Sequence, residues 1–504
     1  GIEPGNEPQN GGFVEVSGKK HLIFRGSVDL SAPNGSLGTL LLDPEDIIIQ
    51  NSDTIGGEFF VPGPDDNQLT ADIPVGNLEG EIFAEDGGPV TYTISRAALQ
   101  DLPGTANLIL EANNNITIEE LVGFGTELTF QAGTGSVSFV ADADGNGVGD
   151  FSMNTANTIS ARGRHLSISG ANIVVGDINT GLGFGSSDGG AVTLNATNGS
   201  ITGGTLYTGT NLQEGSGFLG NGGAVTVTAT GDITLDTINT SSVFNADSLE
   251  SGAGSGGPIT LRSINGNITV QLLDSSASMN EVGTAGNGGE VLVEALNGSV
   301  DTNGIRSYAE SVDGTAGTGG DVVVNAGTSL IIRNLLNSRS SEPNSGGNVE
   351  LTGDQIELPP EGSGQSNNGG ILLLQPSTPN TNIAINAEAE VPGSLSLTQA
   401  GLRNLNSGFD AVTFGRADGT GAVTLDSFDI PIDAPLTVRS PNGTININSP
   451  IEAIDLGSIT LVGATTLNST LTTVNQPIAI QGDVTLGLNP VTLTSGDGAI
   501  TLTG

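Results

Sequence analysis

The 504-residue sequence contains no cysteine and no tryptophan, and only 4% of its residues are aromatic. Without cysteine the chain forms no disulfide and supports no thiolate chemistry. Its large rings are limited to 15 Phe and 3 Tyr, whereas a thick globular core depends on many such side chains. Together these shortages predict a folded chain with a thin core.

Basic residues are also scarce. Lys and Arg number 13 against 55 Asp and Glu, which gives a formal net charge of -42. A nucleic-acid partner needs clustered basic residues that displace counterions, and docking on an anionic membrane surface needs them as well. The composition therefore excludes both classes of partner.

Long apolar runs are missing too. The runs at 40–42 and 371–374 are far shorter than the about 20 residues of a membrane-spanning helix, so we expect no membrane insertion. The sequence opens with GIEPGNEPQNGG, without an initiator Met or the apolar segment of a signal peptide. We interpret it as a processed or trimmed piece of a longer protein.

Glycine, in contrast, is abundant, with 78 residues, and Gly-Gly pairs recur in the middle of the chain. The pairs start at positions 189, 222, 256, 288, 319, 346 and 369, in steps of 33, 34, 32, 31, 27 and 23 residues. Apolar residues stand three and five positions after each first glycine, as Val192 and Leu194 do, which is the periodicity of a β-strand. In the first four units a turn residue follows, and then an apolar residue opens a second strand (Ile201, Ile233, Ile268 and Val300).

Such units cannot bury an apolar side alone, but stacked coils with parallel strands enclose a narrow column of Val, Ile, Leu and Ala. Parallel crossovers are right-handed, so the pattern predicts an all-β right-handed parallel β-helix, a solenoid. We expect the surplus residues of the longest units to project on one side as polar Gly/Ser-rich loops. An antiparallel sandwich array is the alternative, and a propeller does not match the period.

Two segments, 95–104 and 398–408, have an N-cap hydroxyl, leucines at +4 and +7 and a later glycine, which predicts two short helices. The chain is accordingly divided into N-terminal coils (1–50), an irregular insertion (51–92), coils with a short helix and a candidate calcium loop (93–188), the Gly-Gly array (189–375), and C-terminal coils with a second short helix (376–504).

One acidic loop has the spacing of a calcium site. Oxygen-bearing side chains stand at positions 1, 3, 5 and 9, a backbone carbonyl is available at position 7, and Gly147 occupies position 6. Position 12 departs from the pattern, because Met153 replaces the bidentate Glu. The alternative is a solvated acidic turn between strands. The predicted metal ligands are Asp142, Asp144, Asn146, Val148 and Asp150, and calcium is the predicted ion.

Residues suited to catalysis are few. The two histidines, His21 and His165, lie far apart in sequence, and the second follows Arg162 and Arg164 in a small basic patch. Paired carboxylates could serve a glycosidase, and the candidate groups are Asp43/Glu45/Asp46, Asp65/Asp66 and Glu119/Glu120. In so acidic a chain these groups also arise by composition, so we expect no enzymatic activity.

Three stretches carry a family resemblance: GGFVEVSGKKHLIFRGSVDLSAPNGSLGTLLLDPEDIII at 11–49, YTISRAALQDLPGTANLILEANNNITI from Tyr92, and LTQAGLRNLNSGFDAVTFGRADGTGAVTL from Leu397. They resemble the filamentous-haemagglutinin-like exoproteins of two-partner secretion, particularly the cyanobacterial members. The resemblance implies a right-handed β-helix that is exported through an outer-membrane secretion pore and acts in adhesion, aggregation or biofilm formation.

The expected function is that of an extracellular cell-surface or secreted structural protein, a β-helical stalk or a self-assembling filament. Open ends of a solenoid pair with other chains unless they are capped, so head-to-tail association with further copies is expected. Cell-surface glycans are a second expected class of partner. The alternatives are a protein that binds or degrades polysaccharides along one flank and, third, a calcium-dependent surface-layer component.

Overall fold

The computed structural model describes residues 13–17, 39–43, 45–51, 91–122, 125–183, 186–212, 217–245, 251–359, 367–387, 391–404, 408–426, 434–487 and 490–504. The chain divides into two compact units, which are described separately. Unit 1 comprises 1–183, 187–209 and 223–238, and unit 2 comprises 184–186, 210–222 and 239–504. The boundary falls inside the segment 189–375 that the sequence predicts as one regular array.

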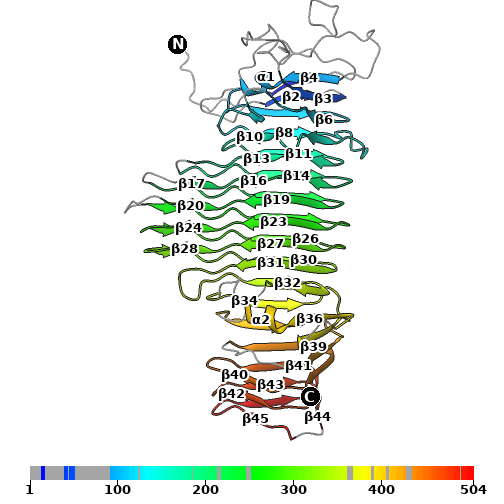
Figure 1. Cartoon of the computed structure of the whole chain (residues 1–504), viewed down its shortest axis with the longest axis vertical. Coiled ribbons are helices and arrows are strands. Elements are labelled where there is room, and N and C mark those ends of the chain that lie inside the picture. The colour runs from blue at the N-terminus through cyan, green and yellow to red at the C-terminus, as the bar shows by residue number, and fades with distance from the viewer. Residues whose placement is uncertain are drawn as a thin grey trace, which may run out of the picture. The chain divides into compact units, whose positions relative to one another are not determined.

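Unit 1 is built from coils whose strands pair in parallel with the equivalent strands of the next coil (Figure 1). One face contains β1 (Phe13–Ser17), β2 (Thr39–Asp43), β5 (Asn107–Glu111), β8 (Val137–Val140), β11 (Leu166–Gly170), β14 (Val192–Ala196) and β18 (Val225–Ala229). A second face contains β4 (Thr91–Ser95), β3 (Asp46–Gln50), β6 (Ile116–Ile118), β9 (Phe151–Met153), β12 (Ile173–Val174), β15 (Ile201–Thr202) and β19 (Ile233–Asn239). A third face joins the second at β19 and contains β7 (Glu127–Thr129), β10 (Thr158–Ser160), β13 (Asp177–Asn179) and β16 (Leu206–Tyr207).

Unit 2 repeats this plan. Its first face contains β22 (Ile259–Ser263), β26 (Val291–Ala295), β30 (Val322–Ala326), β32 (Val349–Thr352), β34 (Ile371–Gln375), β37 (Ala411–Phe414), β39 (Leu436–Ile447), β41 (Ile459–Leu467), β43 (Ile478–Gln481) and β46 (Ile500–Thr503). Its second face begins with β23 (Ile268–Asp274), β27 (Val300–Arg306), β31 (Ser329–Asn337) and β33 (Gln355–Glu357). Further strands are β36 (Ser394–Thr398), β35 (Asn382–Ala387), β38 (Ala422–Leu425) and β44 (Val484–Leu486), and β40 (Ile451–Ala453), β42 (Leu471–Thr473) and β45 (Leu493–Thr494) form a small sheet.

The alternation of buried apolar and exposed polar residues explains why these strands stack. In β14, Val192 and Leu194 are fully buried, whereas Thr193 between them is exposed. The pairing with β18 places Val192 beside Val225 and Leu194 beside Val227. Parallel strands lie about 4.8 Å apart, so like side chains form continuous apolar columns inside the unit. The predicted fold class, a parallel β-helix, is confirmed.

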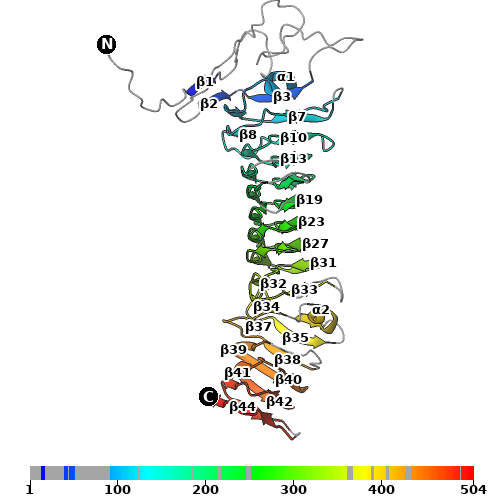
Figure 2. The same cartoon turned by 90° about the vertical axis from the view of Figure 1, so that its left-hand side faces the viewer.

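Local predictions are confirmed as well. All seven Gly-Gly pairs are followed by a strand of this first face, and the second strands begin at Ile201, Ile233, Ile268 and Val300 as predicted. The two short helices are α1 (Arg96–Gln100) and α2 (Gln399–Asn404), and Figure 2 shows α2 beside β35. Each helix buries its first predicted leucine, Leu99 and Leu402. The predicted insertion at 51–92 lies outside the described residues, apart from residue 51 and the start of β4.

The Gly-Gly pairs have a structural role that the sequence did not reveal. In unit 2 the first glycine of each pair lies very close to a segment that crosses the coil. A Cβ on Gly256 would stand 1.7 Å from the carbonyl oxygen of Ser275, and one on Gly288 would stand 1.9 Å from that of Ser307. The second glycine of the next pair completes the contact, because the Gly289 N–H donates to the Ser275 carbonyl at 2.7 Å and the Ser275 hydroxyl donates to the Gly289 carbonyl at 2.8 Å. We call this contact the glycine waist. Only glycine permits so close an approach of two backbones.

Beyond the glycine waist the chain forms a second, smaller stack, which we call the flange. The surplus residues do lie on one side of unit 2, to the left of β23 and β27 in Figure 1, but much of the described part is strand rather than loop. The flange contains β17 (Thr210–Leu212), β20 (Ser242–Phe244), β24 (Ala277–Met279) and β28 (Ala309–Ser311), and β21 (Gly252–Ala253), β25 (Thr284–Ala285) and β29 (Thr315–Ala316). It has its own core, formed by Leu212, Leu219, Phe244, Ala253, Met279 and Ala285. These apolar residues explain why the expected polar loops are ordered strands.

Candidate functional site

The predicted calcium loop lies between β8 and β9 in unit 1. Asp142 adopts a left-handed conformation (φ 55°) and is only 7% exposed. Its carboxylate accepts hydrogen bonds from the Gly147 N–H, at 2.8 and 3.0 Å to the two oxygens, and from the Thr197 hydroxyl at 3.4 Å. The side chain therefore closes the loop on itself.

The remaining predicted ligands have other surroundings. The exposed Asp144 accepts hydrogen bonds from the backbone and side-chain nitrogens of Asn146, at 3.2 and 2.8 Å. Val148, whose backbone carbonyl is the predicted ligand, is 69% exposed. Among the described residues, no group of three or more His, Cys, Asp or Glu side chains is placed to hold a metal ion. Calcium binding by this loop stays a prediction from the sequence.

Asp150, the fifth predicted ligand, belongs to a ladder that links successive coils. Its carboxylate oxygen Oδ1 accepts hydrogen bonds from the backbone N–H and the side-chain amide of Asn172, both at 2.9 Å. In turn, its backbone N–H donates to the side-chain oxygen of Asn115 at 3.0 Å. Each member stands at or directly before the start of a strand of the second face; the members in unit 1 are Asp46, Asn115, Asp150, Asn172, Ser200 and Asp232. The side-chain oxygen of each of the first five accepts a hydrogen bond from the backbone N–H of the next member.

This ladder also accounts for one of the predicted catalytic carboxylates. Asp46 accepts hydrogen bonds from the backbone and side-chain nitrogens of Asn115 at 3.0 and 3.2 Å, so its position is explained by stacking. Glu119 and Glu120 are both exposed next to β6. Asp65 and Asp66 lie outside the described residues, as does the side chain of Asp43.

The basic patch predicted around His165 is only partly on the surface. His165 is exposed, and its Nδ1 accepts a hydrogen bond from the Ala191 N–H at 3.0 Å. Arg164, however, is 1% exposed. Its guanidinium donates to the carbonyl oxygens of Gly135 at 2.7 Å and Ala106 at 2.6 Å. His21 lies outside the described residues.

Burial lowers the pKa of Arg164 to about 10, so the side chain is still charged at neutral pH. The guanidinium carbon also lies 5.7 Å from the ring centroid of Phe130, within range of a cation–π contact. Arg164 thus satisfies carbonyl groups of neighbouring coils from within, and sequence reasoning missed this role because the residue stands in an apparently exposed Arg-Gly-Arg-His run.

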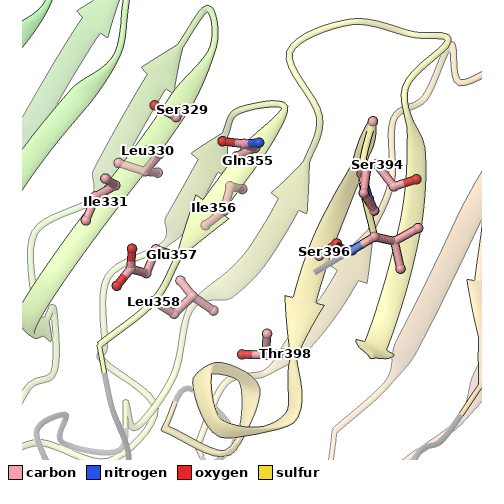
Figure 3. A pocket seen from close by; sticks show the side chains of 13 residues that line it. Ser329, Leu330, Ile331, Gln355, Ile356, Glu357, Leu358, Ser394, Ser396 and Thr398 are labelled. Atoms are coloured by element: carbon pink, nitrogen blue, oxygen red, sulfur yellow. Dashed lines mark hydrogen bonds between the residues drawn. The ribbon is translucent and has the colours of Figure 1, made fainter. Parts of the chain in front are cut away.

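Unit 2 contains an open cavity that sequence reasoning also missed. It has a volume of about 460 Å³ and lies between β33 and β36, with further walls from β31 and from residues 391–393 (Figure 3). Buried Leu330, Ile356 and Leu358 contribute its apolar part. Exposed Gln355 and Glu357 contribute polar groups, together with the hydroxyls of β36. We call this cavity the β33–β36 groove.

The groove exists because the second face is interrupted. β33 pairs with β31, whereas β36 pairs with β35, and no pairing between β33 and β36 is present in the described part of unit 2. The excursion from β34 to β37 that carries β35, β36 and α2 thus introduces a break in an otherwise continuous ladder.

Comparison of the chain with models of known protein families and with curated proteins found no match. Within the described residues, no helix has both the length and the apolar character needed to cross a membrane.

Proposed function

We propose that the chain is a structural and adhesive shaft of a secreted or cell-surface protein, exported as the family resemblance implies and able to associate end to end with further copies. Cell-surface glycans are the partners that such an adhesive shaft would contact. The observation that carries the proposal is the direction of the side-chain bonds, because they run along the stack and join one coil to the next.

In unit 2 these bonds include ion pairs. The guanidinium of Arg262 lies 3.4 Å from the carboxylate of Glu294, its register partner on the next coil. Asp301 binds Arg333 through both carboxylate oxygens, at 3.0 and 2.5 Å. Each exposed pair contributes little by itself, because water and salt screen its charges. The Asn/Asp ladder in unit 1 and these ion pairs in unit 2 link successive coils within each unit, as a load-resisting structural protein requires.

The last described coil presents an apolar edge that a further coil, from a following segment of chain or from a second copy, would cover. Ile478 and Ile480 on β43 are fully buried, whereas their register partners on β46, Ile500 and Leu502, are 44% and 55% exposed. β46 pairs with β43, and its other edge has no partner among the described strands. A further coil on this edge would bury these side chains and satisfy the backbone groups, as it does at every preceding coil.

Negative-stain electron microscopy and light scattering of the purified chain test this proposal. We expect rods that lengthen with protein concentration, and a Leu502→Lys variant that stays short because a charge on the edge opposes strand pairing. Leu456→Lys is the matched control, since Leu456 is 70% exposed on a turn away from this edge. If the parent chain stays monodisperse at the highest attainable concentration, end-to-end association is wrong.

A further inference from the structure

The polar side chains of β33 differ in their bonding from those of the preceding coils. On the neighbouring strands β27 and β31, side chains on the outer surface are linked from coil to coil, as the Asn334 amide donates to the Asn303 side-chain oxygen at 2.6 Å. Within the described residues, Gln355 and Glu357 on β33 form no such hydrogen bond to a side chain of β31 or β36. The interruption of the second face explains the difference, because β36 does not pair with β33 and supplies no register partners. The polar groups of β33 are therefore available to a ligand.

Hydroxyl groups stand across the β33–β36 groove from these side chains. β36 contributes Ser394, Ser396 and Thr398, which are partly exposed, whereas the leucines between them are buried. Figure 3 shows the three residues on the opposite side of the groove from β33. The Ser396 oxygen accepts a hydrogen bond from the Val391 N–H at 2.8 Å, and its own proton can still be donated. The groove thus offers carboxylate and amide groups from one strand and hydroxyl groups from the other.

Aliphatic groups lie among these polar ones. Ile331 is partly exposed on β31, and Val391 is 42% exposed next to the exposed Pro392. The volume of about 460 Å³ is within the range of about 300–1,000 Å³ that is typical of small-molecule sites. A ligand of this size would contact hydrogen-bonding groups and aliphatic carbon together. Sugars present both kinds of surface, because hydroxyl groups surround a ring that carries C–H groups.

The charges of the lining identify the class of sugar. Among the described residues that line the groove, Glu357 is the only charged one and none is Lys, Arg or His. A uronate, sulfate or phosphate group would find no cation there and would lie beside a carboxylate. Arg333 supplies no such cation, because both carboxylate oxygens of Asp301 hold its guanidinium. A cationic ligand is disfavoured as well, since the charge of Arg333 acts on Glu357 and no aromatic ring lines the described part of the groove. These features favour a neutral sugar.

We propose that the β33–β36 groove binds a neutral oligosaccharide segment of a cell-surface glycan. The Glu357 carboxylate accepts hydrogen bonds from sugar hydroxyls, Gln355 and the hydroxyls of β36 complete the polar contacts, and C–H groups of the sugar pack against Ile331 and Val391. The bonds to Glu357 are the strongest, because its acceptor is charged. This inference deepens the proposed function, since it rests on glycans as partners of the shaft. It does not depend on end-to-end association.

Saturation-transfer difference NMR on the full chain tests the site, with cellotetraose and maltotetraose as probes. We expect saturable binding of at least one of these neutral tetrasaccharides, with a Kd on the order of 1 mM because no aromatic ring lines the described part of the groove. Glu357→Ala should raise the Kd about tenfold and Gln355→Ala about threefold, since hydrogen bonds to a charged acceptor are stronger than those to an amide.

Glu290→Ala is the matched control, because it removes an exposed carboxylate ahead of β26, and it should leave the Kd within about twofold. Both Glu357→Ala and Glu290→Ala should melt with the parent chain in circular dichroism, since both residues are exposed. Absence of saturation with both neutral sugars, or equally tight binding of tetragalacturonate, would overturn the proposal. Unchanged binding by Glu357→Ala and Gln355→Ala would also overturn this site, but it would leave glycan contact elsewhere on the shaft intact.

Discussion

Buried polar side chains in this chain form hydrogen bonds mostly with backbone groups. Arg164 reaches the carbonyls of two neighbouring coils, and Thr240 donates through its hydroxyl to the Gly257 carbonyl at 2.6 Å. A parallel β-helix turns sharply at each corner, and its corner carbonyls need donors when they are buried. Single polar residues at repeated positions supply those donors, so their identity reflects stacking rather than catalysis.

Two partly buried tyrosines give a prediction at the scale of single residues. Burial raises the pKa of Tyr207 and of Tyr308, and the nearby Asp274 raises the pKa of Tyr308 further. Above pH about 10 the unfolded chain loses phenol protons that the folded chain keeps. The unfolded state then binds fewer protons, so the free energy of unfolding falls as pH rises through this range.

An absorbance titration of the phenolates measures this effect. In the folded chain these two tyrosines should ionise later than in denaturant, and Tyr308→Phe should remove the later step that belongs to Tyr308 and flatten the loss of stability above pH 10. Ionisation of all tyrosines near pH 10 in the folded chain would contradict the prediction.

At the scale of elements, the glycine waist separates two cores. Gly288→Ala places a methyl group 1.9 Å from the Ser307 carbonyl oxygen, so the two backbones must move apart. We expect a loss of at least about 3 kcal/mol in the free energy of unfolding, since strain and broken hydrogen bonds act together. Thermal and denaturant unfolding followed by circular dichroism measure this loss.

Gly145→Ala is the control for this substitution. Gly145 has a left-handed backbone (φ +68°), which Gly288 does not share, and nothing lies within 4 Å of its Cβ position, so the variant measures backbone strain without a steric clash, about 1 kcal/mol. A loss in Gly288→Ala no larger than that in Gly145→Ala would contradict the large steric cost expected at the glycine waist.

The sequence predicts those elements that local alternation and turn residues specify. Val192, Leu194 and their equivalents marked strands, and the leucines at Leu99 and Leu402 marked helices, because burial there depends on spacing along the chain. The flange was missed because Leu212, Phe244 and Met279 stand at different distances from the next glycine pair, so no fixed register revealed them. The β33–β36 groove was missed because it depends on which strands fail to pair.

The candidate metal loop also shows what the spacing of residues in a sequence leaves undetermined. The spacing of Asp142, Asp144 and Asp150 predicts metal ligands, but spacing does not specify which carboxylate oxygens accept hydrogen bonds from the backbone. Asp142 binds the Gly147 N–H, and Asp150 binds Asn172 on the next coil. These are bonds between segments that only the folded chain brings together.

For the whole molecule, repulsion among the 55 acidic residues should outweigh the few ion pairs. Salt weakens both the repulsion and the ion pairs. Exposed ion pairs contribute little to stability, whereas acidic residues far outnumber basic ones, so the loss of repulsion is the larger effect. We therefore expect the thermal midpoint to rise between low salt and about 0.5 M NaCl, measured by circular dichroism at constant pH. A falling midpoint would mean that the cross-coil pairs dominate.

The glycine waist also explains how coil length varies without disturbing the stack. Successive glycine pairs are 31 to 34 residues apart where the flange is present and 27 and then 23 residues apart beyond it. In each of these coils the chain enters and leaves the flange at the glycine waist. The segment beyond the waist can therefore be lengthened, shortened or replaced while the inner apolar columns keep their alignment. The flange is therefore the natural place for sequence diversification, and for grafting a foreign epitope at regular intervals.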